Sequence, residues 1–180
     1  MSAVSAAAVD AWLVELDLHP VERAERDGVA SWDLVLDGRR RADVRLTLIL
    51  EPSIGLICWA HYAPPLNDAF RVSYRQFLRW NDELPFVKFA LGAGEQPVLA
   101  VELPASGLGR DGVGIAIARL LAVCDLLLAD SMRWLWPGAK APPPLGRERR
   151  VAAVLERYRD ALGEISLGVE EDRAGDPAPR

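Results

Sequence analysis

Residues 78–103, LRWNDELPFVKFALGAGEQPVLAVEL, constrain the fold of this chain more than any other segment. They have the pattern of an amphipathic helix that stops at Pro85, a strand over 86–91, a Gly-rich turn and a second strand over 97–103. Proline ends a helix because it has no backbone N–H, and glycine accepts the backbone angles of tight turns. The segment therefore predicts a helix followed by a β-hairpin.

A β-meander is predicted earlier in the chain. Hydrophobic residues alternate along 44–50, which is the strongest strand signal in the sequence, and flanking strands are expected over 32–36 and 54–62. Short turns with Gly or Pro separate these strands, so neighbours should run antiparallel. The polar residues 22–28 are predicted to be a connection without regular structure.

Four helices complete the prediction, each with apolar residues at helical spacing. They are expected over 3–18, 68–83, 111–134 and 147–162. The resulting order is α-βββ-α-ββ-α plus a C-terminal helix. Strands and helices are segregated along the chain, which indicates an α+β fold with a five-stranded antiparallel sheet.

One main domain is expected from 180 residues. We assign it to 1–136. Consecutive prolines indicate a stiff linker over 137–146, followed by the accessory C-terminal helix within 147–163. The remaining residues, 164–180, are acidic and polar and are predicted to be a disordered tail.

Composition narrows the class of protein. A net charge of -5 argues against a general nucleic-acid binder, which usually carries a basic stripe. The longest apolar run, 113–128, is too short and too charged to span a bilayer, and the N-terminus lacks the basic start of a signal peptide. Cys58 and Cys124 sit in apolar runs, as buried thiols of a reduced protein do. We expect a cytoplasmic protein.

The sequence shows no catalytic or metal-binding pattern. The two histidines are His19 and His61, and a metal site needs at least three protein ligands at compatible positions. Cys58 and His61 lie three apart in one strand, so their side chains should point to opposite faces. No serine lies in an elbow-type signature. The prediction is a non-enzyme with no cofactor and no metal.

A glycine motif leaves one alternative open. Residues Gly107-Leu108-Gly109-Arg110-Asp111-Gly112 match G-x-G-x-x-G between a strand and a helix, where a dinucleotide phosphate can bind. The preceding strand belongs to a hairpin rather than a βαβ unit, and Asp111 would place a carboxylate against the phosphate. We interpret Asp111 as a helix cap. The alternative is a small-molecule or nucleotide-responsive sensor that uses this loop.

Tryptophans suggest a protein-binding surface. Trp134 and Trp136 end a predicted helix just before the Pro-rich linker, and Trp59 is expected to point outward from the sheet with Val35, Ile49 and Ile57. Tryptophan is enriched at interfaces, and large exposed apolar patches mark them. Trp59, Trp134 and Trp136 are the candidate contact residues. For Trp134 and Trp136, packing beneath the C-terminal helix is the other interpretation.

The stretches LRWNDELPFVKFAL and PVLAVELP, with the Gly-rich loop and helix after them, resemble the centre of the YbjN-domain family. This resemblance implies the fold of type III secretion chaperones, usually as a homodimer. Family members are described as sensory transduction regulators and stress-linked proteins, and the fold suggests binding of protein segments. The C-terminal helix and acidic tail extend beyond the family core.

We therefore expect a non-enzymatic, cytoplasmic, chaperone-like adaptor or regulator that binds a partner protein through its sheet face or a helix-lined groove. Beside the sensor, a second alternative is a structural protein whose apolar surfaces serve only self-assembly. The sequence does not show whether the C-terminal helix packs on its own domain or on a neighbour.

Overall fold

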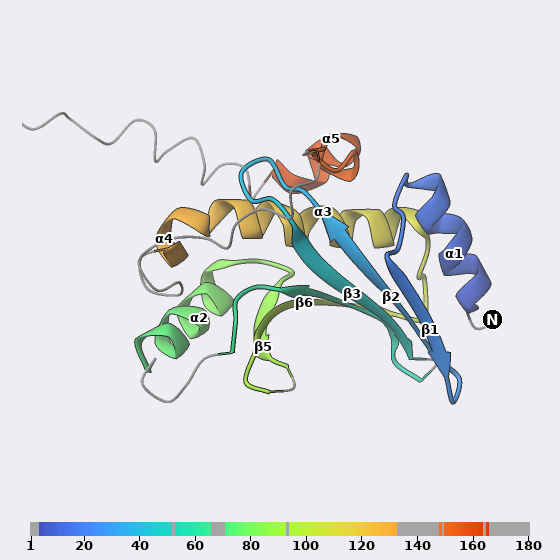
Figure 1. Ribbon diagram of the computed structural model, residues 1–180, viewed down its shortest axis with the longest axis horizontal. Coiled ribbons are helices and arrows are strands. Elements are labelled where there is room, and N and C mark those ends of the chain that lie inside the picture. The colour runs from blue at the N-terminus through green and yellow to red at the C-terminus, as the bar shows by residue number, and fades with distance from the viewer. Residues whose placement is uncertain are drawn as a thin grey trace, which may run out of the picture.

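The computed structural model describes residues 4–51, 53–65, 71–92, 94–132, 148, 150–163 and 165. Its sheet has six antiparallel strands in the order β1-β2-β3-β4-β6-β5 (Figure 1). The strands are β1 (Glu22–Arg26), β2 (Val29–Leu36), β3 (Val44–Glu51), β4 (Gly55–His61), β5 (Lys88–Leu91) and β6 (Pro97–Pro104). The predicted α+β fold with its meander and hairpin is confirmed.

Strand β1 corrects the prediction that residues 22–28 form an irregular connection, and it raises the strand count from five to six. It pairs with β2 from Glu22 opposite Asp33 to Arg26 opposite Val29. Asp27 and Gly28 turn the chain with φ angles of 53° and 81°. Positive φ at both central residues is the requirement of a two-residue hairpin turn, for which Asp-Gly is a favoured pair. All five β1 residues are exposed, so the strand lacks the apolar alternation that marks a half-buried strand.

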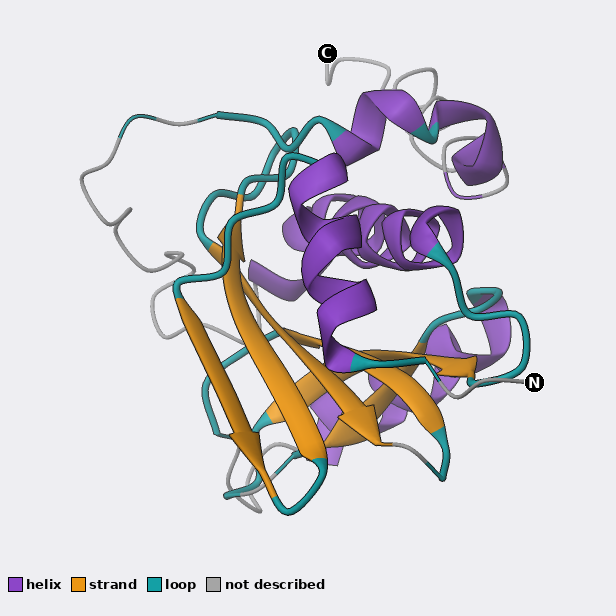
Figure 2. Ribbon diagram, turned by 90° about the vertical axis from the view of Figure 1, so that its right-hand side faces the viewer, coloured by secondary structure: helices purple, strands orange, loops and turns teal. Residues whose placement is uncertain are grey.

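The helices are α1 (Ala6–Glu15), α2 (Arg71–Glu83), α3 (Arg110–Leu126), α4 (Leu128–Met132) and α5 (Val154–Arg157), with a 3-10 turn η3 (Arg159–Leu162). Figure 2 shows α1 and α3 on one side of the curved sheet. The helix expected over 111–134 is divided at Leu127 into α3 and α4. The C-terminal helix begins later than predicted, because Val151 forms a bridge with Asp37 instead of a helical turn.

The core lies between the sheet and α3. Leu34, Leu46 and Ala60 are fully buried on the inner face of three neighbouring strands, and Ile117 and Leu121 of α3 are fully buried as well. The inward residues of β2, β3 and β4 alternate with outward ones, as the period of two in a strand requires. This alternation fixes which side chains the other face presents.

The C-terminal segment packs on its own domain. Val154, Leu155 and Leu162 are buried and belong to the main core. The ring of Tyr158 lies so close to Gly114 of α3 that an added Cβ there would be 2.2 Å from a ring carbon. Glycine at this position therefore lets the segment approach the α3 backbone.

A buried carboxylate holds the loop between β2 and β3. Asp125 of α3 accepts hydrogen bonds from the backbone N–H groups of Arg39, Arg40 and Arg41 at 2.6, 2.9 and 2.7 Å. An added Cβ at Gly38 would be 2.4 Å from the same carboxylate, so the loop needs glycine there. The three consecutive arginines therefore lie in a loop whose backbone binds a carboxylate of the same chain.

The β5 edge of the sheet is capped by a side chain. Asn81 of α2 accepts from the N–H of Phe89 at 2.6 Å, and its amide donates to the carbonyl of Phe89 at 3.1 Å. An added strand would use these backbone groups, so Asn81 takes the place of a neighbouring strand. Phe77 and Trp80 of α2 complete the contact by packing against the Phe89 ring.

Candidate protein-binding face of the sheet

The outer face of the sheet presents polar and apolar side chains side by side. Val35, Ile49, Ile57 and Trp59 are half-buried and point outward, as the alternation predicts. Trp59 lies opposite Thr47 on β3 and Ala100 on β6. It is therefore at the middle of the sheet, between small neighbours that leave part of its ring exposed.

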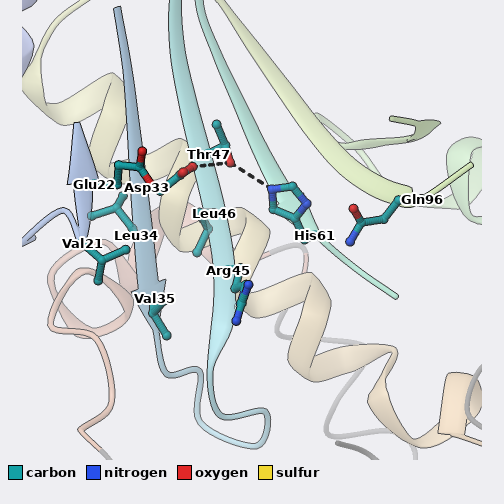
Figure 3. A pocket seen from close by; sticks show the side chains of 10 residues that line it. All are labelled: Val21, Glu22, Asp33, Leu34, Val35, Arg45, Leu46, Thr47, His61 and Gln96. Atoms are coloured by element: carbon teal, nitrogen blue, oxygen red, sulfur yellow. Dashed lines mark hydrogen bonds between the residues drawn. The ribbon is translucent and has the colours of Figure 1, made fainter. Parts of the chain in front are cut away.

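A groove of about 550 Å³ runs across this face. It is lined by Val21, Glu22, Asp33, Leu34, Val35, Arg45, Leu46, Thr47, His61 and Gln96 (Figure 3). The lining mixes carboxylates, a guanidinium, an amide and the aliphatic side chains of Val21 and Val35, whereas the side chains of Leu34 and Leu46 are buried on the inner face of the sheet. A surface of this kind suits an extended peptide, whose backbone needs donors and acceptors and whose side chains need apolar contact.

Three polar side chains form a row across the groove, one from each of β2, β3 and β4. The Thr47 hydroxyl donates to Asp33 Oδ1 at 2.6 Å, and it lies 2.9 Å from His61 Nε2 (Figure 3). A hydroxyl has one proton, and the carboxylate only accepts, so the Thr47 oxygen must accept from His61 Nε2–H. This row was not predicted, although all three residues occupy outward positions of predicted strands.

The direction of these hydrogen bonds does not match a Thr47–His61 nucleophile–base pair. A catalytic base must take the hydroxyl proton, whereas His61 donates its own proton to Thr47. The Thr47 proton is directed to Asp33 instead. The hydrogen bonds fix the orientation of the three side chains, so the row presents a defined pattern of donors and acceptors to a ligand that lies over it.

Both thiols are buried, as predicted. Burial raises the pKa of Cys58 to about 12 and that of Cys124 to about 11, although the nearby Arg41 guanidinium partly offsets the rise at Cys124. A thiol becomes a nucleophile or a metal ligand as the thiolate, so both side chains are inert at neutral pH. Cys58 faces the core and His61 the groove, which confirms that they lie on opposite faces.

The glycine motif starts α3, and Gly109 is the N-cap residue. The interpretation of Asp111 as the cap is wrong, because Asp111 lies in the first helical turn and the cap position has no side-chain hydrogen bond. Its carboxylate instead accepts from Arg110 Nε at 3.0 Å and from the Tyr158 hydroxyl at 2.8 Å. These hydrogen bonds, chiefly the one from Arg110, lower the pKa of Asp111. The carboxylate thus links the motif to the C-terminal segment.

Two of the three predicted contact residues, Trp134 and Trp136, lie outside the described residues, as do the predicted linker over 137–146 and most of the tail over 164–180. Trp59 is therefore the one candidate whose place is known. In the described ranges, no group of three or more His, Cys, Asp or Glu side chains could hold a metal ion. A search of the same ranges finds no helix long and apolar enough to cross a membrane.

An antiparallel sheet with helices packed on one of its faces defines a small α+β protein with a type III secretion chaperone-like fold. The chain is similar to a solved chain of the "Crystal Structure of the ExsC-ExsE Complex", with a TM-score of 0.51 and 19% identity over 76% of this chain and 100% of that chain. Residues 5–129 match the YbjN family, described as "Putative bacterial sensory transduction regulator". The chain belongs to the YbjN family, as the resemblance of residues 78–103 predicted. No curated protein matches it in sequence.

Proposed function

We propose that this protein is a non-enzymatic, chaperone-like adaptor or regulator that binds an extended segment of a partner protein on the outer face of its sheet. The observation that carries the proposal is the groove of about 550 Å³ beside the half-buried Trp59. Its polar row of Asp33, Thr47 and His61 offers hydrogen bonds, and the neighbouring aliphatic side chains offer apolar contact.

The comparisons support partner binding in general terms. The similar solved chain comes from a complex of two proteins, ExsC and ExsE. The family description concerns sensory transduction. We further propose that the protein acts in the cytoplasm in signalling or stress response, that it is a homodimer, and that Trp134 and Trp136 add to the contact surface.

Quantitative co-purification from cells of its own organism tests the proposal. Trp59→Ala removes a large interface side chain, and Leu78→Ala is the matched control, because Leu78 is 69% exposed on α2 and lies outside the outer face. We expect a partner that is retained by the wild type and by Leu78→Ala and is lost with Trp59→Ala. Circular dichroism should show both variants folded.

Equal recovery of every partner with all three proteins would overturn the assignment of this face. Loss of folding in Trp59→Ala would show that the tryptophan is structural, and Thr47→Val then provides the second test. That change keeps the shape of the side chain and removes the hydroxyl at the centre of the polar row. A bound partner that needs the row should be weakened by it.

A further inference from the structure

The two edge strands of the sheet differ, because a side chain caps β5 whereas β1 is exposed along its whole length. Asn81 caps the β5 edge through the backbone of Phe89. The β1 edge is a five-residue strand with every residue exposed, and its neighbour in the sheet is β2 on one side. An exposed edge strand is a template for another strand, and charges on it decide which strands are accepted.

The sequence of β1 is complementary to itself. The strand reads Glu22-Arg23-Ala24-Glu25-Arg26. When two copies run antiparallel about a two-fold axis at Ala24, Glu22 lies opposite Arg26 and Arg23 lies opposite Glu25. Both pairs occur twice, so all four cross-strand charge pairs join opposite charges, and each of them is a stabilising contact.

Neighbouring symmetric registers are penalised. Centring the axis on Arg23 would place Arg23 opposite its own copy, and centring it on Glu25 would do the same for Glu25. Like charges directly opposite each other destabilise a strand pair. The charges therefore select one register and disfavour those on either side of it, which is how a charged edge can accept one partner strand and refuse others.

Helix α1 provides further surface beside the same axis. Asp10 Oδ1 is 3.1 Å from Arg23 Nε, so α1 lies next to the centre of β1, and Figure 1 shows the two elements together at one end of the molecule. Ala7 and Val14 are three residues before and four after Asp10, so they share its side of the helix. Both are exposed, and Val14 is 70% exposed.

We propose that β1 is a homodimer interface, in which two copies pair antiparallel about Ala24 and join their sheets into one continuous sheet of twelve strands. Residues directly opposite each other in a strand pair point to the same face of the sheet. The helices of both subunits therefore lie on one face of the joined sheet, and the outer faces of both subunits form its other face. The two α1 helices flank the axis. This inference rests on the proposed homodimer, which makes the partner a second copy of the chain. The charges of β1 identify the surface on which the two copies pair.

Charge exchange at the outer pair tests the proposal, since Arg23 and Glu25 also bond within the subunit at 3.0 Å. Glu22→Arg places two arginines opposite each other at both ends, and Arg26→Glu does the same with two glutamates. Each variant alone should have a dimer dissociation constant raised about tenfold or more at low salt, measured by sedimentation equilibrium. Glu83→Arg, on the exposed end of α2, changes the net charge as Glu22→Arg does and should leave the constant unchanged.

Two further measurements make the test specific. The double variant Glu22→Arg with Arg26→Glu restores opposite charges and should dimerise like the wild type. Equimolar Glu22→Arg and Arg26→Glu chains should form a heterodimer, because every cross-strand pair then joins opposite charges. Thermal melts of each chain confirm that the variants are folded.

The outcomes separate this inference from the proposed function. A wild-type dimer whose constant is the same in all variants would overturn the β1 interface and leave the homodimer in place. A wild type that is monomeric at tens of micromolar, a protein concentration at which standard interfaces are occupied, would overturn both. Neither result concerns partner binding on the outer face, which is measured by co-purification.

Discussion

Cys58 on β4 and Cys124 on α3 are both fully buried, and their raised pKa values make stability depend on alkaline pH. In the unfolded chain a thiol ionises near its usual value of 9.0, whereas in the folded chain Cys58 keeps its proton to about 12. The stabilisation is complete below pH 9 and is lost as the pH rises toward the folded value, because the unfolded state then releases protons that the folded state retains.

The expected loss for Cys58 is about 2 kcal/mol in the free energy of unfolding between roughly pH 8 and 10.5. Urea unfolding at both pH values measures it. In Cys58→Ala, which lacks the titrating thiol, the decline should be smaller by about that amount. A decline of the same size in both proteins would contradict the burial of this thiol. Burial also raises the pKa of Tyr62, which adds to the alkaline loss in both proteins.

Single residues on strands were the easiest to place from the sequence. The alternation along 44–50 and 54–62 predicted that Cys58 faces the core and that Trp59 faces outward. The role of Asp125 could not be predicted, because its partners Arg39, Arg40 and Arg41 are 84 to 86 positions away in the chain. In the sequence it only interrupted an apolar helix.

At the scale of elements, the cap on β5 gives a direct prediction. Asn81→Ala removes both hydrogen bonds to the Phe89 backbone and should destabilise the fold by about 1–3 kcal/mol. It should also increase aggregation, since the edge strand is then free to pair. Chemical denaturation and light scattering measure the two effects. Asp82→Ala, at an exposed neighbouring position of α2, should change neither. A variant as stable and soluble as the wild type would show that Asn81 does not protect the edge.

The contact between α3 and the C-terminal segment gives a second prediction. Gly114→Ala would place a methyl group against the Tyr158 ring and should destabilise the fold by about 1–3 kcal/mol. In a Tyr158→Ala background the same change should be neutral or stabilising by up to about 1 kcal/mol, because alanine favours a helix over glycine. Thermal or urea unfolding of the four proteins measures the coupling. Equal effects of Gly114→Ala in both backgrounds would mean that the two residues do not touch.

Elements with strong periodicity were predicted well, and those that depend on long-range pairing were not. The meander and the hairpin were confirmed because β3 and β4 alternate and short turns join β3 to β4 and β5 to β6. The sequence contained a signal for β1 in Asp27-Gly28, but the charged strand beside it had no apolar face. The late start of α5 depends on the pairing of Val151 with Asp37, more than a hundred positions away.

At the scale of the whole molecule, the fold was predictable because local signals and the family resemblance agreed, and the match over residues 5–129 confirms the family. The candidate site was predictable in part. Trp59 was expected on the outer face, whereas the groove and the row of Asp33, Thr47 and His61 arise only when three strands are aligned in register. Sequence alternation gives the face of each residue but not its cross-strand neighbours.

Site-specific photo-crosslinking tests the central claim, that a partner protein lies on the outer face, most directly. A photoreactive phenylalanine analogue replaces Trp59 in one protein and Leu78 in the control, and crosslinked products are identified by mass spectrometry after irradiation of living cells. We predict one dominant partner, crosslinked through a defined peptide at position 59 and absent at position 78. The same products from both positions, or a partner that co-purifies yet crosslinks only at position 78, would contradict binding on this face.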